Sequence, residues 1–385
     1  MKSGVKNILN ERKTPLYKII MEHLKSKIYD KELLPGQQLP TELELAKEFN
    51  VSRITSKKAL EELEKEGLIY RKRGHGSFVS NTRYGMSNDS MKKVSMKKVI
   101  SMLMPSENTE SWVTPYIRGA MDALNSKRYF LSIHCSGWDS NRERHIVKEL
   151  VNEGIGGIIY YLPWSYRNID IYYKMYIDKY PIVAIDKAFE IIPLSSVVSD
   201  NFNGGYKAAI HLLELGHRRI AYVSPDNVAN VPSVRERFFG YCSALNDYAI
   251  DIDDEIVIIG HEGLTAGVAF KKQERELCRK IMSNVIKKGV TAVLFENDII
   301  ANKFIKVFHD LGVKIPEDIS VVGFDDIDIL DIADLKLTTV KQDFYRIGRR
   351  AAEIIMEGIE TQKWEYIKEV IPVELVVRET TKQLK

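Results

Sequence analysis

The sequence of 385 residues predicts a small N-terminal α+β domain followed by a larger α/β domain of two doubly wound lobes. The length exceeds that of one ordinary domain. Charge is also uneven: residues 1–98 hold 21 Lys and Arg against 12 Asp and Glu, a net +9, whereas 99–385 hold 35 against 41, a net −6. From residue 99 onward, short apolar runs alternate with helical patterns, which is typical of α/β sheets.

The composition bounds the class of protein. Apolar residues make up 44% of the chain and charged residues 28%, as in soluble globular proteins. No apolar run approaches the roughly 18 residues of a membrane span, and the polar N-terminus has no signal-peptide pattern. Cys135, Cys242 and Cys278 are far apart, which argues against a zinc site or a disulfide framework. We therefore expect a cytoplasmic protein without membrane association, metal or cofactor.

The N-terminal domain, residues 1–80, shows three helix patterns and a hairpin. Apolar residues recur at helical spacing over 15–29. Thr41 and Glu44 form a capping-box pattern before a second helix, and Ser52 is a good N-cap for a third. Two short strands, 68–70 and 77–79, flank the hairpin 71–76. This order predicts a winged helix-turn-helix domain.

The third helix and the hairpin carry the residue types that bind DNA. A helix fits the major groove, where Arg53 near its N-terminus can donate two hydrogen bonds to guanine, and Thr55 and Lys57 can reach bases or phosphates. Gly74 and Gly76 allow close approach of the hairpin. Arg73 and His75 supply donors at the hairpin tip. An ordinary solvated surface is the alternative interpretation of each residue alone, but their occurrence in order favours DNA binding.

Residues 15–79, and above all LPTELELAKEFNVSRITSKKALEELEKEGLIYRKRGHGSFV (39–79), resemble the DNA-binding domain of the GntR family of bacterial transcription regulators. The resemblance implies contacts to double-stranded operator DNA from Thr41, Ser52, Arg53, Thr55, Lys57, Arg73, Gly74, His75 and Gly76. Two positions depart from the family pattern. Leu43 stands where Arg is frequent, so one contact is missing. Ser56 replaces an aliphatic residue, and we expect it to weaken local packing.

Residues 81–98 are polar, rich in Ser, Asn and Lys, and without apolar periodicity, so they predict a flexible linker. In residues 99–385, predicted strands alternate with predicted helices. The predicted strands are 99–104, 129–135, 155–162, 182–185, 220–224, 255–259, 292–295 and 320–324. The predicted helices are 114–126, 141–153, 203–215, 234–247, 274–288, 298–311 and 345–358. The size predicts two lobes, about 99–215 with 342–370 and about 216–341 with 371–385.

Polar residues follow several predicted strands, where ligands bind in open α/β sheets. Examples are Ser136–Asp139, Glu296–Asp298 and Asp325–Asp326. Asp, Asn and Arg pair with sugar hydroxyls, and an aromatic ring covers the apolar face of a pyranose. Helix caps and turns are the alternative interpretation of each Asp or Asn alone.

Several segments are similar to the effector domain of LacI/GalR-type repressors, which is periplasmic-binding-protein-like. They are VVSDNFNGGYKAAIHLLELGHRRIAYVS (197–224), RERFFGY (235–241), TAVLFENDIIANKFIKVFHDLGVKIPEDISVVGFDD (291–326), LTTVKQDFYRIGRRAAEIIMEGI (337–359) and PVELVVRET (372–380). The similarity implies a small sugar effector between the lobes. A homodimer is expected because a single reading helix supplies few base contacts. The implied sugar contacts are Cys135, Asn203, Arg237, Asn297, Asp325 and Phe344, with Trp112 and Trp138 as weaker candidates for stacking.

These features predict a sugar-responsive transcription repressor. A regulator that senses a sugar phosphate or a nucleoside, or that activates transcription, remains open. An enzyme fused to a DNA-binding domain is a further alternative, but the chain has no HExxH, GxSxG or Walker pattern. A sugar-transport component would not need the N-terminal domain. His217, at a helix-to-strand turn, is predicted to be structural.

Overall fold

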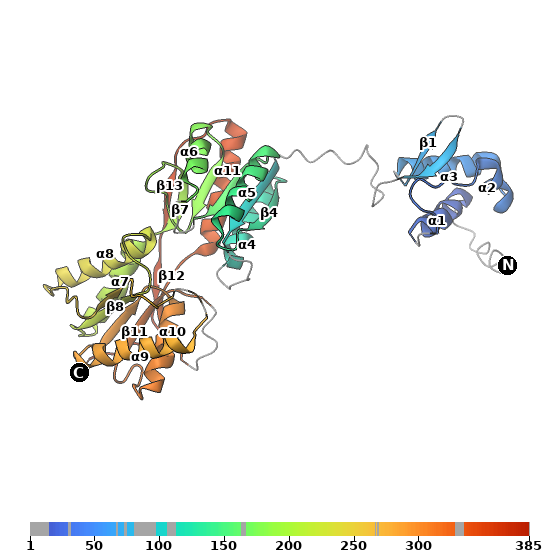
Figure 1. Cartoon of the computed structure of the whole chain (residues 1–385). Helices are drawn as coiled ribbons and strands as arrows, with labels where there is room; N and C mark the ends of the chain where they lie inside the picture. The colour runs from blue at the N-terminus through green and yellow to red at the C-terminus, as the bar shows by residue number, and fades with distance from the viewer. Residues whose placement is uncertain are drawn as a thin grey trace. The chain divides into compact units, whose positions relative to one another are not determined.

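The computed structural model describes residues 15–29, 32–66, 68–72, 75–80, 98–105, 113–162, 167–265, 267, 269–327 and 335–384. The chain divides into two compact units, Met1–Val94 and Ser95–Lys385 (Figure 1). Most of the predicted linker, 81–97, lies outside the described residues. None of the described helices is long and apolar enough to cross a membrane.

The first unit consists of three helices and an antiparallel two-stranded sheet, as predicted. The elements are α1 (Leu16–Tyr29), α2 (Glu42–Glu48), α3 (Arg53–Lys65), β1 (Ile69–Lys72) and β2 (Gly76–Val79). Buried Leu24, Leu45 and Leu60 join the three helices in one apolar core. Burial of one face of each helix leaves the opposite face of α3 free for a partner.

The turn between α2 and α3 is fixed by side-chain hydrogen bonds. The Thr41 hydroxyl accepts from the Glu44 backbone N–H, and the Glu44 carboxylate accepts from the Thr41 N–H at 2.7 Å, which completes the predicted capping box. Ser52 caps α3 by accepting from the Thr55 N–H. Ser56, at which we expected weaker local packing, makes a hydrogen bond between the two helices. Its buried hydroxyl contacts the Glu42 carbonyl oxygen at 2.7 Å, so it links α3 to α2.

The first lobe of the second unit is a parallel six-stranded sheet in the order β13-β7-β6-β5-β3-β4. Helices α4 and α11 pack on one face, and α5 and α6 on the other. The strands are β3 (Val99–Met104), β4 (Phe130–Cys135), β5 (Gly157–Tyr161), β6 (Ile182–Ile185), β7 (Ser195–Ser199) and β13 (Lys368–Ile371), and the helices are α4 (Val113–Ser126), α5 (Ser140–Asn152), α6 (Ile169–Ile177) and α11 (Phe344–Thr361).

The second lobe repeats this plan in the order β14-β12-β11-β10-β8-β9, with only β14 antiparallel. Helices α7 and α8 cover one face, and α9 and α10 the other. The strands are β8 (Ile220–Ser224), β9 (Val257–Ile259), β10 (Ala292–Phe295), β11 (Ser320–Asp325), β12 (Thr338–Lys341) and β14 (Glu374–Val376), and the helices are α7 (Asn201–Glu214), α8 (Pro232–Asp247), α9 (Lys272–Lys287) and α10 (Asp298–Asp310).

The structure confirms the two doubly wound lobes but differs from the sequence-based prediction in detail. Helix α7 was expected in the first lobe, yet it packs on α8 in the second, because its buried alanines and leucines contact the apolar faces of β8 and β11. Elements α6, β7, β12, β13 and β14 were not predicted. The chain crosses between lobes three times: before α7, between β12 and α11, and between β13 and β14.

Glycines allow two pairs of helices to cross at backbone contact, one pair in each lobe. A Cβ on Gly119 of α4 would lie 1.9 Å from the Tyr345 carbonyl oxygen of α11. In the second lobe, a Cβ on Gly205 of α7 would lie 2.1 Å from the Arg237 carbonyl oxygen of α8. The α7–α8 crossing therefore fixes the position of Arg237, because any side chain at Gly205 would push its backbone away.

Gly205→Ala should lower the free energy of unfolding by about 1–3 kcal/mol, the usual cost of overpacking a core. The clash is with backbone, which cannot rotate out of the way. Gly267→Ala is the matched control, because a Cβ on Gly267 would have nothing within 4 Å and the φ of this residue is not in the left-handed region. Urea unfolding of the two variants beside the parent chain measures both effects, and equal midpoints would contradict the prediction.

Candidate functional site

Helix α3 presents a cationic face in the first unit. The Arg53 side chain is 67% exposed, and its Nε donates to the Glu42 carboxylate at 3.1 Å. Lys57 is exposed one turn further along, 3.7 Å from Glu61. Arg71 on β1 donates to the Lys57 carbonyl oxygen at 3.3 Å. Ion pairs of this kind at an exposed surface are weak, so Arg53 and Lys57 can exchange them for phosphates or bases.

The remaining predicted DNA contacts are hydroxyl groups at the helix N-termini and residues of the hairpin. The Thr41, Ser52 and Thr55 hydroxyls are already hydrogen-bonded at the two helix N-termini. Gly76 has a φ of +108°, and a Cβ there would meet the Gln38 side chain at 2.7 Å. Gln38 also donates to the His75 carbonyl oxygen at 2.9 Å. The predictions for Arg73 and Gly74 lie outside the described residues.

A cavity of about 580 Å³ lies between the two lobes of the second unit. Its walls are built largely from residues that follow the carboxyl ends of strands, where ligands bind in such sheets. It is lined by Trp138, Tyr161, Asp186, Lys187, Asp226, Val231, Ser233, Val234, Arg237, Leu264, Thr265, Gly267, Glu296, Asn297, Ile299, Asp325, Gln342 and Phe344. Among the described residues, no cluster of three or more His, Cys, Asp or Glu side chains is arranged to hold a metal ion.

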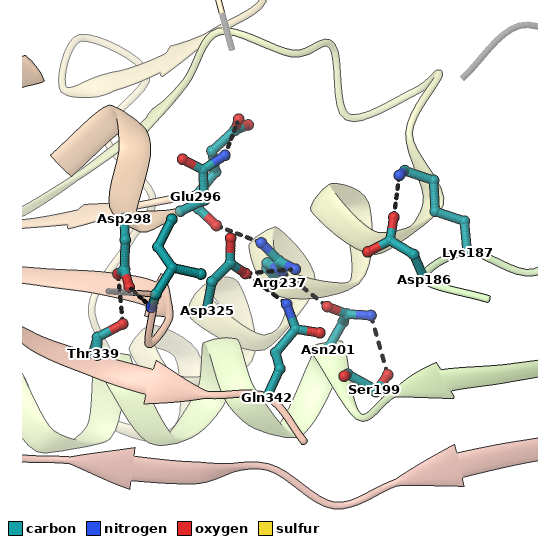
Figure 2. A network of polar contacts seen from close by, with 12 residues as sticks. Asp186, Lys187, Ser199, Asn201, Arg237, Glu296, Asp298, Asp325, Thr339 and Gln342 are labelled. Carbon is teal, nitrogen blue, oxygen red and sulfur yellow. Dashed lines mark hydrogen bonds and ion pairs between the residues drawn. The ribbon is translucent and has the colours of Figure 1, made fainter. Parts of the chain in front are cut away.

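Arg237 of α8 is the centre of a polar network in this cavity (Figure 2). Its Nε donates to the Asn201 side chain at 2.9 Å, and one terminal nitrogen donates to the Glu296 carbonyl oxygen at 2.6 Å. The other terminal nitrogen lies 3.5 Å from the Asp325 carboxylate. The guanidinium also stacks 3.8 Å from the centroid of Phe324. The side chain is therefore held in one orientation.

Asp325 connects this network to a second crossing segment. Its carboxylate accepts from the Gln342 side-chain amide at 2.5 Å, and Gln342 lies between β12 and α11. Burial raises the pKa of Asp325 to about 6, although Arg237 and Gln342 favour the ionised form. Asn201 begins α7, directly after the first crossing. Arg237 and Asp325 thus contact two of the three connections between the lobes.

A carboxyl pair lies on the second-lobe wall of the cavity. Burial, followed by the nearby Asp226 charge, raises the pKa of Glu296 to about 8, and burial raises the pKa of Asp226. The Ser224 hydroxyl contacts both the Asp226 carbonyl oxygen, at 2.8 Å, and the Glu296 carboxyl. Because a hydroxyl carries one hydrogen, a proton on Glu296 lets both contacts form.

Charged residues also form pairs at the cavity wall and between the two lobes. In the first lobe, Lys187 pairs with its neighbour Asp186, and its ammonium lies 4.9 Å from the Tyr161 ring centroid. Arg235 of α8 in the second lobe pairs with Glu190 of the first lobe. The two lobes therefore contact each other through an ion pair next to the cavity-lining residue Val234, and this pair breaks if the lobes separate.

The cavity brings together four of the predicted effector contacts, Arg237, Asn297, Asp325 and Phe344, together with Trp138. Cys135 and Asn203 do not line it. Asn203 donates to the Asp200 carboxylate near the start of α7, whereas Asn201, which also does not line the cavity, accepts from Arg237. Trp112 lies outside the described residues.

The alternative interpretation of polar strand ends as caps is also right for several residues. Asn297 caps α10 by accepting from the Ile300 N–H, and Asp139 caps α5. Asp326 fits neither interpretation, because it pairs with Arg378 at 2.6 Å and does not line the cavity. His217 is buried between Thr291 and the Lys382 carbonyl oxygen, in a structural position.

Sequence reasoning missed several lining residues. Asp186, Lys187 and Asp226 follow the predicted strands 182–185 and 220–224 closely, so the strand-end rule could have found them. Gln342 follows a strand that was not predicted. Thr265 reaches the cavity through a loop held by the buried Lys303–Glu274 pair, for which the sequence carries no signal.

Family comparisons match both units. Residues 16–79 match the family of bacterial regulatory proteins called the gntR family, and residues 209–381 match the periplasmic binding protein-like domain. The fold and these matches define the class: the chain is a transcription regulator that joins a gntR-type winged helix-turn-helix domain to a periplasmic-binding-protein-like domain.

Within this class the chain is similar over its length to the arabinose metabolism transcriptional repressor of Geobacillus stearothermophilus, with 28% identity over 98% of this chain and 100% of the relative. The HTH-type transcriptional regulator DegA of Bacillus subtilis is 28% identical over 66% of this chain and 73% of its own. A crystal structure of a LacI family regulator from Enterococcus faecium with bound ribose aligns at a TM-score of 0.61 and 27% identity, over 74% of this chain and 100% of that one.

The raised pKa of Glu296 predicts a pH-dependent stability that Glu296→Gln removes. An ordinary Glu releases its proton near pH 4.5, whereas Glu296 in the folded protein retains it to about pH 8. The folded state therefore binds more protons between these values, and stability falls as the pH rises through them. Urea unfolding at pH 5.5 and pH 8 should show a larger fall for the parent chain than for Glu296→Gln, whereas identical falls would contradict the assignment.

Proposed function

We propose that this chain is a cytoplasmic, non-enzymatic repressor of carbohydrate-utilisation genes that binds operator DNA as a homodimer and is released by a neutral sugar bound between its lobes. The main support for a sugar ligand is the cavity at the junction of the two lobes, which is lined by carboxyl groups, an arginine, amides and aromatic rings. Two reading helices are expected because one helix supplies few base contacts.

The charge of the cavity favours a neutral ligand over a sugar phosphate. Asp186, Asp226 and Asp325 line it beside Glu296, whose pKa of about 8 leaves it largely neutral, against two cations, Lys187 and Arg237. Arg237 is already occupied by Asp325 and two oxygen acceptors. A phosphate would face these carboxyls with no free cation cluster to neutralise it, whereas sugar hydroxyls donate to carboxylates and accept from amides and Arg.

Arabinose is the leading candidate for the sugar. Two relatives that are similar over nearly the full length of the chain are arabinose metabolism repressors, from Geobacillus stearothermophilus and Halalkalibacterium halodurans. The aligned Enterococcus faecium regulator holds ribose, which is also a pentose. We assign the polar contacts to Arg237, Asn297 and Asp325, and the ring contacts to Phe344 and Trp138.

The contacts of Arg237 and Asp325 with the crossing segments let a ligand act on the arrangement of the lobes. A sugar that takes hydrogen bonds from these two side chains competes with Asn201 and Gln342, which belong to two of the connections between the lobes. Ligand binding can therefore change the angle between the lobes. The size of the effect is limited by how much more tightly the ligand binds one arrangement of the lobes than the other. If the sugar lowers the affinity for operator DNA by some factor, operator DNA lowers the affinity for the sugar by the same factor.

Calorimetric titration of the full chain with L-arabinose, D-ribose, D-xylose and their phosphates tests the ligand. We expect binding of a free pentose and a loss of roughly 10-fold or more for Arg237→Lys, since charged hydrogen bonds contribute about 1.5–3 kcal/mol. Arg275→Lys is the matched control, because Arg275 pairs with Asp310 at 2.7 Å outside the cavity. Preferential binding of a phosphate, or consumption of the sugar in the same cell, would overturn the proposal.

Operator binding is tested by salt titration on duplexes enriched from a random library. Lys57→Gln should weaken binding to all DNA sequences. It should also lower the slope of log binding constant against log salt concentration by about 1 for each copy of Lys57 bound, as expected for the loss of a phosphate contact. Arg53→Lys keeps the positive charge but cannot donate two hydrogen bonds side by side to one base. It should therefore lower the free energy of discrimination in favour of one guanine by about 1–3 kcal/mol. A binding constant that does not change with salt would contradict both roles.

A further inference from the structure

Ile54 is an exposed apolar residue in an otherwise polar and cationic part of α3. The residue is 79% exposed, the highest value for any large apolar residue in the described part of the chain. It lies in the first turn of α3, directly after Arg53. A branched apolar residue at such a position brings no benefit to the folded monomer.

The position of Ile54 on the helix is specific. The core-facing side of α3 carries Ser56, Ala59, Leu60 and Leu63. With about 3.6 residues per turn, Ile54 lies on the opposite side, at the middle of the exposed face. Arg53 and Lys57 are exposed on one side of it, and the Lys58 ammonium is turned to the Tyr17 ring, 4.4 Å from its centroid. Ile54 is therefore the most outward residue of the first turn.

A second exposed apolar residue lies at the start of the neighbouring helix. Leu43 in the first turn of α2 is 55% exposed and lines a groove with Arg53, Lys72 and Gly76. Glu42 next to it holds the Arg53 guanidinium. The surface that faces a duplex thus presents two aliphatic groups beside its cations. Single exposed apolar residues are common, but two at adjacent helix N-termini on a cationic surface are not explained by packing.

We propose that Ile54 is a specificity-determining residue that reads the 5-methyl group of a thymine in the major groove. The inference rests on the proposed DNA binding by α3. Thymine is the only base that presents a methyl group there, and apolar side chains recognise it by contact. The N-terminal residues of a recognition helix are the ones that reach base edges. Arg53 and Lys57 hold the helix in the groove, and Ile54 selects an A·T pair.

The test removes the methyl group alone. The full-length protein is used to enrich duplexes from a random library, and each thymine of the selected duplex is then replaced singly by deoxyuridine. We expect one thymine per half-site at which replacement by deoxyuridine lowers the affinity of the parent chain about fourfold. This factor corresponds to about 0.8 kcal/mol, the usual contribution of one buried methylene-sized group. Ile54→Ser should bind more weakly and show no loss at that same position.

Ile54→Val is the conservative control and should retain most of the methyl sensitivity. Because Ile54 is exposed, all three proteins should unfold at the same temperature, which excludes a folding effect. If enrichment succeeds but the deoxyuridine losses are equal in the parent and Ile54→Ser, the inference is wrong while DNA binding stands. If no duplex is enriched, the proposed function itself fails, and the inference with it.

Discussion

The fixed position of the Arg237 guanidinium is the constraint on which the organisation of the second unit depends. One side chain contacts the start of α7, the end of β10 and the end of β11, and it stacks on Phe324. A buried cation is stable only where acceptors surround it. Two of these acceptor residues, Glu296 and Asp325, line the cavity with Arg237 itself, so the group that stabilises the junction between the lobes is also the group that we propose meets a ligand.

Close helix crossings make this arrangement possible. In both lobes a glycine lets two helices meet at backbone distance, at Gly119 and Gly348 in the first and at Gly205 and Gly240 in the second. In the second lobe the crossing places Arg237 itself. Rigid lobes with a polar junction between them respond to a ligand by changing their mutual angle, because a packed interior does not deform continuously.

The two units use their polar residues differently. In the first, hydroxyls close the helix N-termini and leave the cations and two aliphatic side chains exposed for a partner. In the second, carboxyls are buried, and burial raises the pKa values of Asp226, Glu296 and Asp325. Exposed charge suits a salt-dependent contact with a polyanion, whereas buried carboxyls suit directional hydrogen bonds to a neutral ligand.

The sequence by itself determined both architectures and the caps at Thr41 and Ser52, because helix periodicity and capping are local signals. Arg237, Asn297, Asp325 and Phe344 of the cavity were predicted from the resemblance to LacI/GalR-type effector domains. Only the tertiary structure decided the lobe of α7, the strands β7, β12, β13 and β14, and the roles of Asn201 and Gln342. These depend on pairing between segments far apart in the chain. Asn203 and Asn201 lie on the same helix turn, and only the packing of α8 selects which of them meets Arg237.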